Sequence, residues 1–147
     1  ALAHAPRYCR VADTREALAH AVAAFYGNPS RALSVVGITG TSGKTTTAFI
    51  LESILKAAER QVGVIGTIDY RFLNQSIPAS HTTPEPEQLQ KLLAEMAGGG
   101  CDSVIMEVSS HALSQRRVSA IAFDAVWRLS LSETCSPFIF FNASASP

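Results

Sequence analysis

Residues 40–47, Gly-Thr-Ser-Gly-Lys-Thr-Thr-Thr, have the order and composition of a loop that binds phosphate groups, and the apolar run 33–38 before them predicts a buried strand. Glycines in such a loop let backbone N–H groups close on phosphate oxygens, and the helix that follows adds its dipole. Lys44 would supply a mobile positive charge and Thr45 a hydroxyl for Mg²⁺. Because Ile38 stands where the standard Walker spacing has its first glycine, we interpret the loop as a compact Gly-x-x-Gly-Lys-Thr variant. The alternative is a glycine turn before an ordinary helix.

Two more polar groups lie at the ends of predicted elements. Glu107 ends the apolar run 104–106, where a carboxylate beside a phosphate loop could hold Mg²⁺ directly or through water. A glutamate that faces solvent at the end of a strand is the alternative. Residues 81–86, His-Thr-Thr-Pro-Glu-Pro, place two hydroxyls at the start of a predicted helix, where an anionic ligand would be favoured. Sequence physics alone favours a simpler role, in which Thr83 only caps that helix.

Ser109, Ser110 and His111 come directly after Glu107. Adjacency in sequence does not make a catalytic triad, and no oriented acid partner is evident, so nucleophilic catalysis is disfavoured. Residues 115–117, Gln-Arg-Arg, offer donors suited to carboxylate or phosphate. A solvated basic turn explains them equally well.

Alternating strands and helices are predicted to position these groups. We predict strands over 33–39, 61–68 and 102–108, and helices over 11–26, over 44–59 and from Pro84 to the glycines at 98–100, with a linker at 27–30 and a polar loop over 69–83. The first helix would be capped by Thr14 and would bury Leu18, Val22 and Phe25. Continuously apolar strands that alternate with helices predict an α/β fold, a mostly parallel sheet with helices on both faces. Ligands of such sheets bind at the carboxyl ends of the strands.

The composition narrows the class of protein. A chain of 147 residues with 47% hydrophobic and 16% charged residues can form one domain with a core, and is not disordered. Its net charge of zero excludes non-specific attraction to nucleic acid. The three separated cysteines, Cys9, Cys101 and Cys135, disfavour a zinc site or disulfide framework and suit a reducing compartment. We expect no signal peptide and no membrane span, hence a cytoplasmic protein, and make no prediction of its oligomeric state.

Four motifs in order resemble the Mur ligase family, and within it the MurE-type ligases of peptidoglycan synthesis. They are residues 35–47, 63–67, 81–86 and 106–118, and the similarity runs from about residue 20 to Asp124. The compact loop spacing is the family's own, although Ser42 stands where the family usually has Asn. The resemblance implies the P-loop-type sheet of the family's central ATPase domain, incomplete here. By domain, 1–32 would be the end of an N-terminal UDP-binding domain and linker, 33–124 the N-terminal part of the ATP-binding domain, and 125–147 a divergent tail.

The resemblance implies an ATP-dependent amide ligase with ATP and Mg²⁺ as cofactors. Its substrates would be UDP-N-acetylmuramoyl-L-alanyl-D-glutamate, whose γ-carboxylate takes the γ-phosphoryl group of ATP, and a diamino acid, meso-diaminopimelate or L-lysine, whose amine displaces phosphate. No nucleic acid or membrane partner is implied. Two alternatives stay open. One is a non-catalytic nucleotide-binding fragment, and the other is a related ligase such as a folylpolyglutamate synthase.

Roles carried over from the family fall on matching positions. Lys44 and Glu107 would be catalytic, and Thr45 and Glu107 would hold Mg²⁺. The ATP phosphates would lie on Gly40, Thr41, Ser42, Gly43, Lys44, Thr45 and Thr46. Substrate would be bound by Thr82, Thr83, Ser109, Gln115 and Arg117, with His81 adjoining at a position that varies in the family.

The chain departs from the family after Asp124. There the family continues into Asn-Leu and a segment with a Mg²⁺-ligand histidine, followed by a carbamylated lysine, whereas residues 125–147 contain neither lysine nor histidine. We therefore expect a frameshifted or truncated tail and no amino-acid-selecting C-terminal domain. The sheet would keep an unpaired edge, and this chain alone would be inactive.

Overall fold

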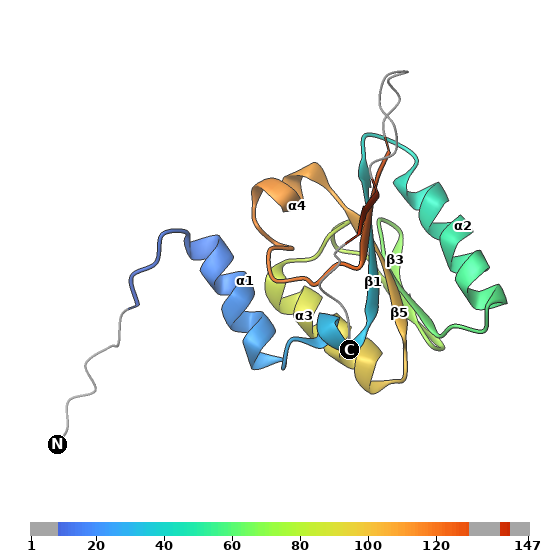
Figure 1. The fold of residues 1–147 in the computed structure, drawn as a ribbon, viewed down its shortest axis with the longest axis horizontal. Helices are drawn as coiled ribbons and strands as arrows, with labels where there is room; N and C mark the ends of the chain where they lie inside the picture. The colour runs from blue at the N-terminus through green and yellow to red at the C-terminus, as the bar shows by residue number, and fades with distance from the viewer. Residues whose placement is uncertain (1–8, 130–138, 142–147) are drawn as a thin grey trace.

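The computed structural model of the chain describes residues 9–129 and 139–141, and its centre is a seven-stranded sheet (Figure 1). The strands are β1 (Ser34–Gly40), β2 (Val62–Ile65), β3 (Asp69–Phe72), β4 (Gln75–Pro78), β5 (Ser103–Val108), β6 (Ala125–Leu129) and β7 (Ile139–Phe141). They lie in the order β4-β3-β2-β5-β1-β6-β7. The four central strands β2, β5, β1 and β6 are parallel, and β3, β4 and β7 are antiparallel to their neighbours. The predicted mostly parallel sheet is confirmed.

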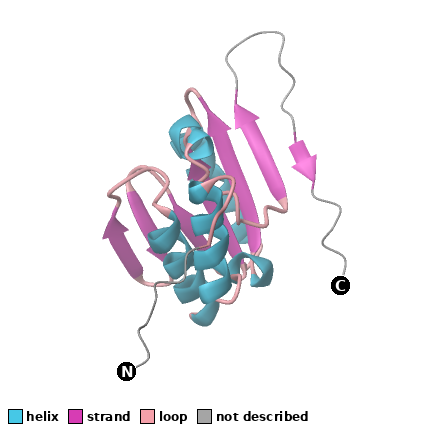
Figure 2. Ribbon diagram, turned by 90° about the vertical axis from the view of Figure 1, so that its left-hand side faces the viewer, coloured by secondary structure: helices cyan, strands magenta, loops and turns pink. Residues whose placement is uncertain are grey.

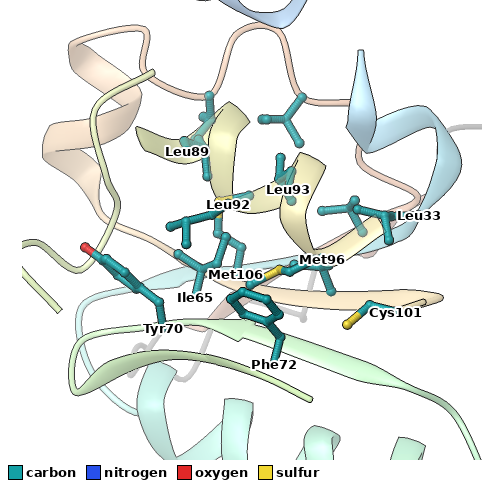
Figure 3. Packing of buried hydrophobic residues seen from close by; sticks show 14 of the residues in the cluster. Leu33, Ile65, Tyr70, Phe72, Leu89, Leu92, Leu93, Met96, Cys101 and Met106 are labelled. Atoms are coloured by element: carbon teal, nitrogen blue, oxygen red, sulfur yellow. The ribbon is translucent and has the colours of Figure 1, made fainter. Parts of the chain in front are cut away.

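Helices cover both faces of the sheet (Figure 2). They are α1 (Thr14–Phe25), the 3₁₀ turn η1 (Pro29–Ala32), α2 (Lys44–Ala57), α3 (Pro86–Gly98) and α4 (Ser110–Ser114). On one face, Leu89, Leu93 and Met96 of α3 pack on Ile65 and Met106 of the sheet (Figure 3). On the other face, α2 packs on a second cluster that includes Ile38, Val64 and Ile105. Because side chains alternate along a strand, the two faces of one strand serve two separate cores.

The polar loop predicted over 69–83 is wrong over residues 69–78, because β3 and β4 form an antiparallel hairpin there. Tyr70 and Phe72 alternate with polar residues and are buried against α3, which gives the strand a core face. On the opposite face, Arg71 pairs with Glu52 of α2 and lies 4.3 Å from the ring centroid of Phe49. The hairpin widens the sheet beside β2.

The first helix forms as predicted, but its cap and its buried face differ. Asp13, not Thr14, is the N-cap, and its carboxylate accepts the N–H groups of Arg15 and Glu16. Phe25 is 83% exposed, whereas Ala19 is buried. The helix contacts α3, and its buried residues, Ala19 and Ala23, have small side chains that let two helices approach closely.

Residues 125–129 extend the sheet rather than leave β1 at an edge. They form β6, which pairs in parallel with β1. Asp124 fixes the start of this strand, since its carboxylate accepts the Val35 N–H at 2.7 Å and its own N–H donates to the Val35 carbonyl. An unpaired edge of the sheet therefore does not lie at β1. Most of the predicted tail, 130–138 and 142–147, lies outside the described residues. No helix of the described segments is long and apolar enough to span a membrane.

Candidate functional site

The glycine loop joins β1 to α2 at the carboxyl edge of the parallel strands. Gly40 ends β1 with φ of 139°, and Gly43 precedes α2 with φ of 80°, both conformations that favour glycine. A Cβ on Gly40 would lie only 2.2 Å from the Leu129 carbonyl oxygen, so the close approach of β6 also requires glycine. Lys44 opens α2 and donates from Nζ to the Gly40 carbonyl at 2.8 Å, which places its ammonium group over the loop. The unpaired N–H groups of the first turn and the helix dipole favour an anion here.

Glu107 lies beside this loop and is 1% exposed, so the solvent-facing alternative is wrong. Its Oε2 accepts hydrogen bonds from the hydroxyls of Thr45, at 2.9 Å, and of Thr67, at 3.0 Å. Its Oε1 accepts the Thr67 N–H at 3.1 Å. The sheet register explains the contact, because Glu107 of β5 is opposite Ile38 of β1, on the face covered by α2. The glycine loop and the carboxyl end of β5 thus lie next to each other.

Gly66 and Thr67, which follow β2, complete the surroundings of this carboxylate and had been given no role from the sequence. A Cβ on Gly66 would lie 2.6 Å from Glu107 Oε1, so glycine makes room for the carboxylate. Thr67 Oγ1 also lies 3.2 Å from Thr82 Oγ1, which joins the predicted substrate residue to the Glu107 network. A Gly-Thr pair directly after an apolar strand was the available signal, since ligand-binding groups gather at such strand ends.

Thr83 is buried and does not cap the helix that follows it, so the capping prediction is wrong. Helix α3 begins later, at Pro86, and its N-cap Glu85 makes no side-chain capping bond. The Thr83 hydroxyl donates to the Glu107 carbonyl at 2.9 Å and accepts the Ser109 N–H at 3.0 Å. Thr83 therefore fastens residues 81–86 to the end of β5.

Arg117 holds the same segment from the other side. It is 7% exposed, which contradicts a solvated basic turn at this position. Its guanidinium donates to the Thr83 carbonyl at 2.9 Å and to Gln115 Oε1 at 2.6 Å, and pairs with Glu85 at 2.6 Å. Its neighbour Arg116 is exposed instead.

The remaining predicted substrate residues differ in accessibility. Ser109 is half-buried and caps α4, accepting the Ala112 N–H at 3.1 Å. His81 has an exposed side chain, and its backbone N–H and carbonyl both bond to the Tyr70 hydroxyl, at 3.1 and 2.6 Å. Gln115 reaches the wall of a separate cavity of about 240 Å³ that Arg15 also lines. Thr82 and Ser109 thus lie near the Glu107 network, and Gln115 lies on its periphery.

A cavity of about 540 Å³ separates the glycine loop from the first turn of α4. Gly40, Thr41 and Lys44 form one wall, Ser109 and Ser110 form another, and Thr39, Leu113, Arg128 and Leu129 complete it. Its lining contains two basic side chains and no carboxylate. The cavity is suited to an anion held between the loop and α4.

The donors beside the loop fit Mg²⁺. Thr45 and Glu107 present a hydroxyl and a carboxylate, hard oxygen ligands 2.9 Å apart. Within residues 9–129 and 139–141, no group of three or more His, Cys, Asp or Glu residues forms an all-protein metal site. One carboxylate with one hydroxyl is the sparse protein contribution typical of Mg²⁺ sites completed by phosphates and water. The predicted Mg²⁺ residues are thus brought together in space.

Comparison with known proteins identifies the family of the chain. Residues 38–134 match the Mur ligase middle domain. The chain is 51% identical over 117 residues to a UDP-N-acetylmuramoyl-L-alanyl-D-glutamate–2,6-diaminopimelate ligase of Geobacter metallireducens, covering 80% of this chain and 23% of the relative. The ligase of the same name from Corynebacterium efficiens is 48% identical over 123 residues, covering 84% and 23%.

Solved structures agree on the fold. The structure of a ligase of that name superposes with a TM-score of 0.74 at 25% identity, covering 86% of this chain and 26% of that one. A structure of E. coli FolC in complex with DHPP and ADP has a TM-score of 0.60 at 24% identity, covering 88% and 36%. The chain therefore spans about a quarter of the length of the curated relatives it matches.

Proposed function

Since the chain belongs to the Mur ligase family, we propose that it is the ATP-binding part of a ligase that extends a peptidoglycan precursor. The proposed reaction joins a diamino acid to UDP-N-acetylmuramoyl-L-alanyl-D-glutamate through an acyl phosphate. The names of the relatives favour 2,6-diaminopimelate over L-lysine. The cytoplasm, where ATP and the UDP-linked precursor are available, is its proposed location.

The observation that carries the proposal is the contact between Thr45 and Glu107 beside a glycine loop that ends in Lys44. Transfer of a phosphoryl group to a carboxylate brings two anions together, so the site must neutralise charge and align the reactants. Lys44, whose ammonium group lies over the loop, would neutralise charge on the transferred phosphoryl group. Thr45 and Glu107 would hold Mg²⁺, which would neutralise charge on the phosphates. Residues 40–46 hold those phosphates through backbone N–H groups.

The substrate side of the site divides into contacting and positioning residues. The polar atoms of Thr83 and Arg117 already bond within the protein, so we propose that these two residues position residues 81–86. His81 and Thr82 of this segment and the nearby Ser109 have accessible side chains and are proposed to contact the muramoyl dipeptide. Gln115 supports Arg117 and contacts the substrate only at its edge.

Binding measurements test this function against the two alternatives. Isothermal titration of the chain with Mg-AMPPNP should give binding, and the loaded chain should then bind UDP-N-acetylmuramoyl-L-alanyl-D-glutamate and not dihydrofolate. Preference for dihydrofolate would favour a folylpolyglutamate synthase, in keeping with the FolC-like fold. If the chain bound nucleotide but neither the muramoyl ligand nor dihydrofolate, it would be a non-catalytic nucleotide-binding module. A Thr82→Val variant should lose affinity for the muramoyl ligand alone.

A further inference from the structure

A second basic side chain faces the glycine loop from β6. Arg128 is paired with Thr39 in the parallel register of β6 and β1, one residue before Gly40. Paired residues of neighbouring strands place their side chains on the same face of the sheet. Thr39 is also paired with Val108, which packs in the core beneath α3. Arg128 therefore lies on the face that carries α3 and α4, whereas Leu129 packs with the core of α2.

Arg128 and Lys44 line the same cavity of about 540 Å³, from two different elements. The cavity has Thr41 of the loop on one side and Ser109 of α4 on the other. No ion pair within the described part of the chain uses Arg128, although seven are formed there by other residues. Two cations without a neighbouring carboxylate in the lining repel each other, and an oxyanion between them removes that repulsion.

We propose that Arg128 is a second oxyanion-binding residue of this site, acting with Lys44 on a group bound in the cavity. The planar guanidinium matches the paired oxygens of a phosphate or a carboxylate and makes two parallel hydrogen bonds to them. In a phosphoryl-transfer site, two anions have this chemistry: the terminal phosphate of the nucleotide and the carboxylate that receives it. This inference rests on the proposed function. It adds a residue of the segment after Asp124, where the chain departs from the family pattern and no role is implied by resemblance.

Nucleotides that differ by one phosphate test the proposal. Dissociation constants for Mg-ADP and Mg-AMPPNP are measured by isothermal titration for the parent chain, Arg128→Ala, Arg128→Lys and the control Arg31→Ala. Arg31 is an exposed arginine of η1, before the amino end of β1, so its removal changes the net charge equally. If Arg128 contacts the terminal phosphate, Arg128→Ala should bind Mg-AMPPNP at least tenfold more weakly and Mg-ADP within twofold of the parent. Arg128→Lys should lose less affinity for Mg-AMPPNP, because lysine keeps the positive charge but lacks the paired N–H donors of the guanidinium.

A second measurement tests whether the anion that Arg128 binds is instead the carboxylate of the muramoyl ligand. In the presence of Mg-ADP, Arg128→Ala should then bind UDP-N-acetylmuramoyl-L-alanyl-D-glutamate at least tenfold more weakly, while Mg-AMPPNP affinity stays unchanged. Equal loss for both nucleotides, or no change for either nucleotide and for the muramoyl ligand, would overturn the role of Arg128. Failure of the parent chain to bind nucleotide would overturn the proposed function itself. Unliganded thermal midpoints of all variants establish that each one folds.

Discussion

Replacing Glu107 by glutamine separates the fold of the site from its proposed metal chemistry. The glutamine keeps the shape of Glu107, its Oε1 still accepts the Thr67 N–H, and its NH₂ group faces the Thr45 and Thr67 hydroxyls, which rotate to accept. Bonds to a charged group are worth about 1.5–3 kcal/mol and neutral ones about 0.5–1.5 kcal/mol. We therefore expect a stability loss of about 1–2 kcal/mol, or a fall in the unfolding midpoint of about 2–8 °C.

The effect on Mg²⁺ should be larger than the effect on the fold. A pair of unit charges about 4 Å apart is worth about 4 kcal/mol at an effective dielectric constant of 20, and dehydration of the ion offsets part of it. Loss of only a third of this energy, about 1.4 kcal/mol, weakens binding tenfold. Affinity for AMPPNP should therefore fall at least tenfold with Mg²⁺ present and stay near the parent value in EDTA.

Titration calorimetry with and without Mg²⁺ measures this difference. Glu95→Gln is the matched control, because Glu95 is an exposed carboxylate of α3 far along the chain from the loop. If Mg²⁺ increased the AMPPNP affinity of Glu107→Gln and of the parent equally, the assignment of Glu107 to the metal would be refuted.

Three other changes have expected results. Gly40→Ala places a Cβ 2.2 Å from a carbonyl oxygen of β6, so it should destabilise the chain by about 1–3 kcal/mol in urea unfolding and abolish nucleotide binding. Thr83→Val removes the hydroxyl that pairs the part-buried Ser109 N–H and the buried Glu107 C=O, so it should cost about 2–4 kcal/mol, and Thr83→Ser should restore most of the loss. Burial raises the pKa of Glu52, but hydrogen bonds from Arg71 and Lys56 outweigh it and hold that pKa below its ordinary 4.5. Its ion pairs therefore stabilise the fold above pH 4.5 and are lost as the pH falls through the lowered pKa, so Glu52→Gln should be less stable at pH 7 and equal to the parent in acid.

The arrangement of the loop and the two strands could be predicted because it depends on local sequence. Gly40 and Gly43 indicate a loop with unusual backbone angles, and the apolar runs before Gly40 and Glu107 indicate two buried parallel strands. Once two such strands are expected, topology places both of their carboxyl ends at one edge of the sheet. The meeting of Thr45 with Glu107 follows from that rule, although its distance does not.

The parts that were missed depend on contacts between distant segments. Thr83 has the type and position of a helix cap, but its partners are in and after β5, 24 and 26 residues away. Strands β3 and β4 have only four residues each, too few for alternation to outweigh their polar content. The buried face of α1 differs from the prediction because the alanines Ala19 and Ala23 are buried, whereas the larger side chains Leu18 and Phe25 are exposed.

Thermal unfolding with and without Mg-ATP tests the central claim that this loop holds nucleotide phosphates. The parent chain and Lys91→Ala, which removes an exposed lysine of α3, should unfold about 5–10 °C higher at a ligand concentration about 100 times Kd. Lys44→Ala should show no such rise, because the phosphates lose the cation that the loop places over them. An equal rise in Lys44→Ala, or none in the parent, would contradict the claim.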